Sequence, residues 1–272
     1  MANKTKLKPD LATIAGLIVA ALGIVGGLLL EGGSIRDIAQ PTAAIIVLGG
    51  TAGAVMVNYP LGTCMGGLRR LAHVFLDPST DIQALIEEIA GLATKARKTG
   101  IVSLERDAPD VSNPFLGKAL SLAVDGTDMQ ELRRMLELDV TLCEHHAEQE
   151  AKVWESAGGY SPTVGILGAV MGLIQVMKNL ADIDAVGHGI ATAFVATVYG
   201  VALANLFFLP AGSKIKGRAH QDTLVRELII EGVLGIVEGL NPKLVRLKLE
   251  SYSASHGLPG KPGSGDDAKL AA

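Results

Sequence analysis

The sequence predicts an all-α, polytopic membrane protein with four transmembrane helices and a helical cytoplasmic domain. Hydrophobic residues make up 49% of the 272 residues and charged residues only 19%, which is typical of a membrane protein that also has a soluble portion. Four apolar segments are each long enough to cross a hydrocarbon layer of about 30 Å as a helix. Glycine is abundant, with 33 residues, while aromatic residues make up only 4%, and this favours helices that pack through small side chains.

The four spans divide the chain into five parts, defined by hydropathy and by the composition of the segments between them. They are the N-terminal transmembrane hairpin 1–58, with spans at 11–30 and 40–58; the cytoplasmic helical domain 59–160; the C-terminal transmembrane hairpin 161–210, with spans at 161–179 and 189–210; the cytoplasmic C-terminal helices 211–250; and the Gly-, Pro- and Ser-rich tail 251–272, which we expect to be disordered.

The distribution of positive charge predicts the orientation of the chain in the membrane. Of the 24 Lys and Arg residues, only Arg36 and Lys178 lie in the two hairpin loops. Positively charged segments stay on the cytoplasmic side of a membrane. We therefore expect the long loop and both the N- and C-termini to be cytoplasmic.

The cytoplasmic parts are predicted to be helical. Residues 80–83 have the form of a capping box and precede apolar residues with a period of 3.6. Residues 127–130 open a second helix, which we expect to run nearly to the membrane because nothing breaks it before Gly158 and Gly159. A further helix follows the fourth span and ends at residues 241–242, and one more short helix is predicted at 243–250.

Small residues form a stripe on each of the last two spans. These residues recur at i, i+3, i+4 and i+7, so they share one helix face that allows close approach. They are Gly165, Gly168, Ala169 and Gly172 in the third span and Ala193, Ala196, Thr197 and Gly200 in the fourth.

No catalytic constellation and no metal site is evident, so we do not expect an enzyme or a bound cofactor. The histidines never fall at ligand spacing with carboxylates, and a metal site needs converging ligands. The two cysteines, Cys64 and Cys143, form neither a disulfide framework nor a metal motif. The net charge of −4 gives no indication of nucleic-acid binding.

The four spans contain no ionisable side chain well inside them. Ion transport through lipid normally needs such a group, so an ion path would require a carboxylate from another polypeptide. Hydroxyl and amide side chains in the last two spans could solvate that group or its ion. They are Thr163, Thr192, Thr197, Tyr199 and Asn205. The alternative, which spacing alone favours, is that these side chains bond to carbonyls of their own helix.

Four motifs, occurring in the expected order, resemble the MotA/PomA stator subunits of the bacterial flagellar motor. They are Ala96-Arg97-Lys98-x-Gly100-Ile-x-x-Leu104-Glu105; Pro162-x-x-Gly165-Ile-Leu-Gly168-x-x-x-Gly172-Leu; Ala196-Thr197-Val-Tyr199-Gly200-x-x-Leu-Ala204-Asn205, continued by Phe207-Phe-Leu-Pro210; and Leu228-Ile-Ile-Glu-Gly232-Val-Leu-x-Ile236, followed by Asn241-Pro242. The resemblance covers roughly residues 10–250.

This resemblance implies a bacterial inner-membrane protein, surrounded by lipid, that forms a homo-pentamer around two copies of a MotB-like single-span subunit. That subunit supplies the ion-binding Asp, and ion flow drives the ring against the rotor protein FliG. Carried over by position, the residues have three roles. Arg97, Lys98 and Glu105 would contact the rotor. Thr197 would line the ion path, with Ala169, Thr163 and Tyr199 beside it. Pro162 and Pro210 would couple ion passage to a change of shape. Without the resemblance, the three charged residues would be interpreted as a solvated helix face.

Two positions depart from the family's pattern. A second acid often follows Glu105 in the family, whereas this chain has Arg106 and then Asp107, which leaves the polarity of the rotor contact open. Sodium-driven relatives carry Thr at the position of Ala169. Because hard cations prefer oxygen ligands, we expect H⁺ to be the transported ion and keep Na⁺ as the alternative.

Two other functions remain as alternatives. An ExbB/TolQ-like energiser of outer-membrane processes resembles stators in mechanism, but those relatives usually have three spans and this chain has four. A membrane scaffold without transport is the other, and it would make no use of the hydroxyl groups in the third and fourth spans.

Overall fold

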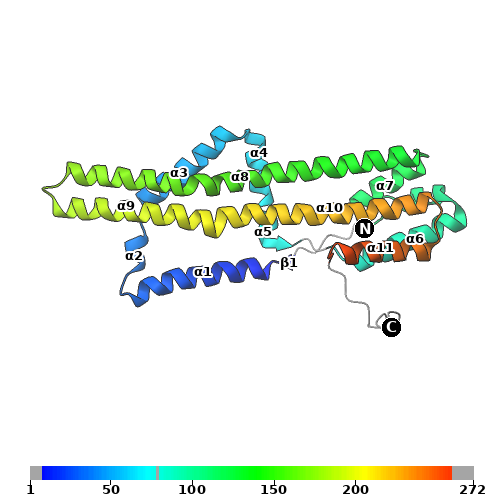
Figure 1. The fold of residues 1–272 in the computed structure, drawn as a ribbon, viewed down its shortest axis with the longest axis horizontal. Coiled ribbons are helices and arrows are strands. Elements are labelled where there is room, and N and C mark those ends of the chain that lie inside the picture. Colours follow the sequence, from blue (N-terminus) through cyan, green and yellow to red (C-terminus); the bar gives the residue numbers. More distant parts are fainter. Residues whose placement is uncertain (1–7, 78–79, 259–272) are drawn as a thin grey trace. The chain divides into compact units, whose positions relative to one another are not determined.

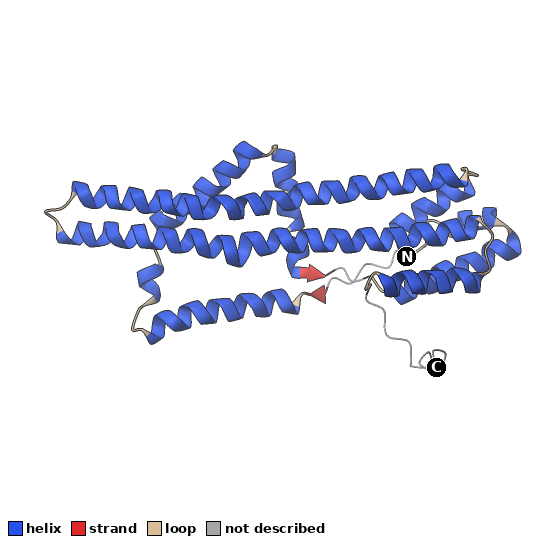
Figure 2. Ribbon diagram, viewed as in Figure 1, coloured by secondary structure: helices blue, strands red, loops and turns tan. Residues whose placement is uncertain are grey.

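The computed structural model describes residues 8–77 and 80–258, which fold almost entirely as helices (Figures 1 and 2). The chain divides into two compact units. The described part of the membrane unit comprises residues 8–77 and 146–217, and that of the soluble unit comprises 80–145 and 218–258. Two long helices, α8 (Met129–Lys178) and α10 (Leu209–Val237), have residues in both units.

The membrane unit begins with two-residue strand β1 (Lys8–Pro9), which pairs antiparallel with β2 (Leu76–Asp77). The backbone N–H of Asp10 also donates to the Phe75 carbonyl at 2.8 Å, so the start of the first span is held against the segment just before β2. The helices between the two strands are α1 (Leu11–Leu30), α2 (Ile35–Ile38), α3 (Pro41–Asn58), α4 (Leu61–Arg70) and α5 (Ala72–Phe75).

The second membrane hairpin contains the C-terminal part of α8, then α9 (Ile183–Leu203), a π-helical turn η2 (Ala204–Phe208) and the start of α10. Within the described residues, four helical segments are long and apolar enough to cross a membrane: Leu11–Leu30, Pro41–Asn58, Met129–Lys178 and Ile183–Val237. The predicted fold class, all-α with four transmembrane helices, is therefore confirmed.

The soluble unit is built around one hydrophobic core. Its elements are α6 (Ile82–Thr99), the 3₁₀-helix η1 (Ile101–Arg106), α7 (Pro114–Val124), the first turns of α8, most of α10, and α11 (Pro242–Ser255). Ile89, Leu120, Leu136 and Leu228 are fully buried in the core. The apolar period predicted for 82–92 faces this core, which explains the amphipathic pattern of α6.

Several helix bounds differ from those predicted. Helix α9 begins at Ile183, six residues before the predicted start of the fourth span at 189, because the Asp182 carboxylate caps it by accepting from the N–H groups of Asp184 and Ala185 at 3.1 and 3.2 Å. The predicted end of the second cytoplasmic helix near Gly158 was wrong, because α8 continues without interruption to Lys178. Helices α4 and α7 were not predicted.

The start of the predicted disordered tail was also placed too early. Helix α11 continues to Ser255, because Ser253 is buried and the Tyr252 hydroxyl donates to the Glu227 carboxylate at 2.5 Å. Residues 251–255 are therefore helical. Residues 259–272, the rest of that predicted tail, lie outside the described part of the chain.

Candidate functional site

The small-residue stripe of α8 packs against that of α9 in the same chain. We call this contact the helix seam. A Cβ added to Gly165 would lie 2.8 Å from the Ala196 carbonyl oxygen, and one added to Gly172 would lie 2.7 Å from that of Gly189. Side chains larger than hydrogen do not fit at such distances. The close approach predicted from the sequence is thus made within the membrane unit of a single chain.

Helix α3 covers one side of this seam. Val164 of α8 occupies the space where Gly50 lacks a side chain, since a Cβ on Gly50 would lie 2.6 Å from it. Ala43 and Val47 of α3 form a buried cluster with Val195 and Ala196 of α9. Three of the four predicted spans therefore meet at the seam.

Tyr199, predicted to line an ion path, connects α9 to the segment before α3. Its hydroxyl donates to the Ile38 carbonyl and accepts from the Gln40 N–H at 3.4 Å. Both hydrogen-bonding roles of the hydroxyl are used within the chain. In this structure Tyr199 fixes the α9–α3 contact.

The other candidate path residues bond to their own helices. The Thr197 hydroxyl donates to the Ala193 carbonyl at 3.3 Å, the Thr163 hydroxyl to that of Tyr160 at 2.8 Å, and the Asn205 amide to that of Val201 at 2.9 Å. This is the geometry that spacing alone favoured. A hydroxyl that donates in this way still has lone pairs with which to accept. Thr163 is exposed, while Thr197 and Ala169 are half-buried.

The two predicted coupling residues differ in their effect on the helices. Pro162 lies inside α8 without ending it, and next to it the buried Ser161 hydroxyl donates to the Gly200 carbonyl at 3.0 Å. Pro210 lies two residues after the end of the π-helical turn, as the second residue of α10, and the Leu209 N–H donates to the Ala204 carbonyl five residues back. A π turn beside a proline is a local irregularity of the kind found at functional hinges.

An aromatic cluster stabilises the same region of the membrane unit. The Trp154 ring lies 5.9 Å from the Phe207 ring and 6.1 Å from the Phe208 ring, measured between centroids. Its indole N–H donates to the Gly67 carbonyl at 2.9 Å. The irregular turn before Pro210 is therefore packed from one side by α8 and α4.

The predicted rotor-contact residues lie on two packed elements of the soluble unit. Arg97 and Lys98 are exposed in the last turn of α6, and Glu105 is exposed in η1. Gly100 joins the two elements with a φ of +84°, a conformation that favours glycine. The fully buried Leu104 anchors η1 to the core.

The two residues that depart from the family's pattern have different environments. Asp107 accepts from the Lys95 ammonium group at 2.7 and 2.9 Å. Arg106 is exposed and forms no salt bridge with the rest of the described chain. Asp107 is thus neutralised by a neighbour, while Arg106 adds positive charge to the surface.

Comparison with known proteins establishes the family. A model described as the motility protein A N-terminal region matches residues 14–100, and that of the MotA/TolQ/ExbB proton channel family matches residues 107–228. Motility protein A of Bacillus subtilis (strain 168) is 33% identical over 93% of this chain and 92% of its own length. The chain belongs to the motility protein A family.

Other motility proteins and two solved structures agree with this. Chemotaxis protein PomA of Vibrio alginolyticus is 33% identical to this chain, over 89% of this chain and 95% of PomA. The C. jejuni MotAB structure has a TM-score of 0.84 at 31% identity and covers 95% of this chain and 98% of that chain. The MotAB stator complex of Bacillus subtilis has a TM-score of 0.82 at 33% identity, covering 91% and 98%.

Membership of the motility protein A family also bears on the alternatives. The N-terminal motility model covers most of α1 and all of α3, the hairpin whose presence argued against the three-span ExbB/TolQ type.

Three features of the membrane unit were not found from the sequence: the π turn, the hydrogen bonds of the Tyr199 hydroxyl and the ion pair between Lys214 and Asp10. Each depends on proximity between residues distant in sequence or on backbone geometry, for which the sequence carried no signal.

Proposed function

We propose that this chain is a stator subunit of a bacterial flagellar motor. With a MotB-like partner it forms an ion channel, and ion flow through the channel produces torque on the rotor protein FliG. The observation that carries this proposal is the similarity, over nearly its whole length, to the chains of two MotAB complexes. The role is transport and force transmission, so no catalytic residue is assigned.

The membrane unit supports the need for a partner. The helix seam offers hydroxyl oxygens, including that of Thr197, but the predicted spans contain no carboxylate well inside them. An ion-binding Asp from a single-span subunit would complete the site, because a group at depth must exchange the ion. We propose a homo-pentamer in the inner membrane, by analogy with the stator family, with both termini cytoplasmic because the Lys and Arg residues favour that orientation.

We further propose that the transported ion is H⁺. Ala169 lacks the hydroxyl oxygen that a sodium ion would use as a ligand. A steep dependence of swimming speed on sodium concentration at constant pH would overturn this assignment. The outcome expected for H⁺ is a speed that is insensitive to sodium and falls when an uncoupler collapses the proton gradient.

Deletion of the gene tests the stator proposal itself. We expect cells that still assemble complete flagellar filaments but do not swim, with motility restored by the gene in trans. Normal swimming of the deletion strain, or loss of the filaments, would contradict a role in torque generation. A strain with an outer-membrane transport defect and normal motility would point to the ExbB/TolQ type.

A further inference from the structure

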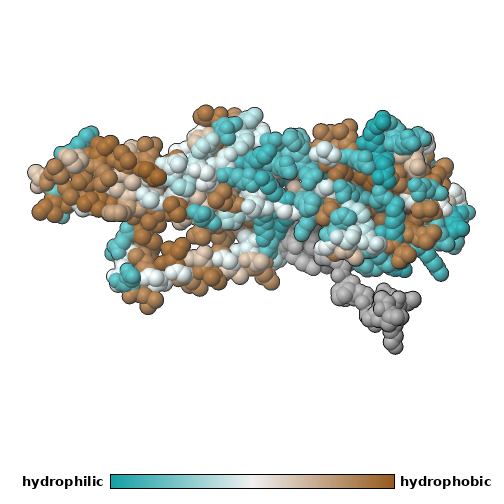
Figure 3. Space-filling model, in the orientation of Figure 1, coloured by the Kyte–Doolittle hydropathy of each residue, from teal (hydrophilic) through white to brown (hydrophobic). Residues whose placement is uncertain are grey.

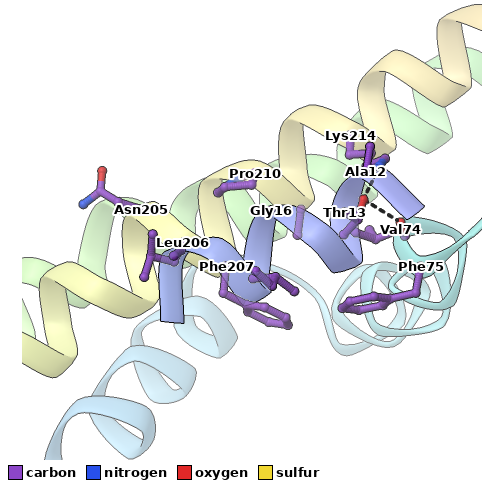
Figure 4. A pocket seen from close by; sticks show the side chains of 13 residues that line it. Ala12, Thr13, Gly16, Val74, Phe75, Asn205, Leu206, Phe207, Pro210 and Lys214 are labelled. Carbon is purple, nitrogen blue, oxygen red and sulfur yellow. Dashed lines mark hydrogen bonds between the residues drawn. The ribbon is translucent and has the colours of Figure 1, made fainter. Parts of the chain in front are cut away.

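An apolar groove follows α1 where this helix faces the end of α9 and the start of α10. Its first part has a volume of about 400 Å³ and is drawn in Figure 4. It is lined from α1 by Thr13 and Gly16, from α5 by Phe75, and from the opposite helix by Phe207, Pro210 and Lys214. All of these residues belong to the membrane unit.

A second cavity continues the groove along the same two helices. It has a volume of about 450 Å³ and is lined by Ile24 of α1 and by α9 residues that include Thr197 and Val201. Asn205 and Leu206 line both cavities. Figure 3 shows gaps between α1 and the α8–α9 hairpin that are bordered by hydrophobic residues. The groove therefore runs from Lys214 at one end to Thr197 at the other.

The length of the groove matches one leaflet of a bilayer. Thr13 and Ile24 are 11 residues apart on α1, which corresponds to about 16 Å at a rise of 1.5 Å per residue. Half of a hydrocarbon layer of about 30 Å is roughly 15 Å. The space thus has the length of one acyl chain.

Polar groups are concentrated at one end. The Lys214 ammonium group pairs with the Asp10 carboxylate and donates to the Thr13 hydroxyl, which in turn donates to the Val74 carbonyl at 3.5 Å. Asp10 also caps α1 by accepting from the Thr13 N–H at 3.0 Å. Beyond this end the lining is apolar except for Asn205 and Thr197, whose donors are already bonded to carbonyls of their own helix.

We propose that this groove binds one acyl chain of a membrane phospholipid, with the tail extending along α1 toward Ile24 and Val201. The headgroup phosphate faces the Lys214 ammonium group, and the neighbouring Asp10 carboxylate matches the ammonium of a zwitterionic headgroup such as phosphatidylethanolamine. The continuous apolar lining, the one-leaflet length and the charged end together match a lipid tail and its headgroup.

A lipid chain fits this groove better than a helix of a second copy. A helix with its side chains is about 10 Å wide, whereas the two cavities have volumes of only about 400 and 450 Å³. A Cβ added to Gly16 would meet nothing within 4 Å, so the chain leaves space here that it does not fill itself. The tail would lie against Pro210 and the π turn, and would prevent α1 from closing onto the proposed hinge.

Photocrosslinking of lipid to the full-length protein tests this site. The oligomer is purified and reconstituted in nanodiscs of phosphatidylethanolamine that contain a small fraction of the same lipid with a diazirine near the end of one acyl chain. After irradiation, the labelled residues are mapped by mass spectrometry. We expect label to concentrate around Ile24 and Val201. Equal labelling of exposed residues on α8, such as Leu167 and Ile174, would overturn the proposal, as would crosslinks between neighbouring copies in place of lipid.

Two matched substitutions on α1 give a second measurement. Gly16→Leu places a side chain in the groove and should lower labelling at Ile24 and Val201 roughly five-fold or more, because a filled slot excludes the chain. Ala15→Leu adds the same bulk one position away, outside the lining, and should leave labelling unchanged. Equal labelling in both variants would contradict the proposal. The mapping in the unsubstituted protein holds even if Gly16→Leu does not fold, and neither readout depends on motility.

Discussion

Gly165 of α8 and Gly200 of α9 lie in contact across the helix seam. A Cβ on Gly200 would lie 3.0 Å from the Gly165 Cα and 2.6 Å from the Ser161 carbonyl oxygen. The neighbouring atoms are backbone, so they cannot move aside as the end of a flexible side chain would. Pro162 lies at the same crossing, with its Cα 3.3 Å from that added Cβ. The proposed coupling residue therefore sits at a point of close backbone contact between the two helices.

Gly200→Val should separate α8 from α9 and destabilise the membrane unit by about 1–3 kcal/mol, the usual cost of overpacking. We expect a lower thermal unfolding midpoint in detergent and poor swimming from a chain that still reaches the membrane. Gly187→Val is the matched control, because Gly187 lies on the same helix and an added Cβ there meets no atom within 4 Å. Equal midpoints for the two variants would show that the seam tolerates a side chain.

The charges around the predicted rotor contact lead to a second prediction. Asp107 is bound by Lys95, whereas Arg97 and Arg106 are exposed. We expect Arg97→Glu to lower torque and to be partly rescued by reversing an acidic residue of FliG. Arg106→Glu should lower torque as well. Asp107→Asn should have little effect, because exposed ion pairs contribute only about 0.2–1 kcal/mol.

The measurement for this surface is the rotation speed of a bead attached to a flagellar stub, at matched protein levels. If Asp107→Asn lowers the rotation speed as much as Arg106→Glu does, then the carboxylate of Asp107 contributes to the contact and the positive charge of Arg106 is not the deciding group. Failure to find any FliG substitution that rescues Arg97→Glu specifically would count against direct contact.

The sequence predicted what depends on composition and local periodicity. The four spans, the amphipathic face of α6 and the close-approach stripes follow directly from hydropathy and from helix geometry. Spacing could not indicate that the stripe containing Gly165 meets the stripe containing Gly200 in the same chain, because a small-residue face can equally pack against another copy. The start of α9 was missed because Asp182 and Asp184 are typical of a loop as well as of a helix cap.

Other features arise only from the three-dimensional structure. Pro162 was expected near a helix end, but membrane helices accommodate proline when neighbouring groups satisfy the backbone, and α8 continues through it. The groove beside α1 depends on residues near Thr13 facing residues near Lys214, which are about 200 positions apart in the sequence. No local pattern encodes such a pairing.

The last prediction concerns the soluble unit and acid. Glu231 of α10 accepts from Lys248 at 2.5 Å and from Arg133 at 2.9 Å. Partial burial alone would raise the pKa of Glu231, but the hydrogen bond and charge of Lys248, together with Arg133, outweigh it and lower the pKa below its ordinary value. A carboxylate with a lowered folded-state pKa stabilises the fold above its unfolded pKa, and this stabilisation is lost as pH falls through the folded pKa.

We therefore expect Glu231→Gln to lower the unfolding midpoint of the purified protein near pH 7. The difference from the unsubstituted protein should shrink below about pH 4, because the Glu side chain of the unfolded chain is mostly protonated there and the folded carboxylate loses its advantage. Circular dichroism melts at several pH values measure both proteins under the same conditions. Glu137→Gln, which removes a more exposed partner of Arg133, is the control and should change the midpoint less at pH 7. A difference for Glu231→Gln that stays constant from pH 7 to acid would show that the loss comes from packing and not from the charge of Glu231.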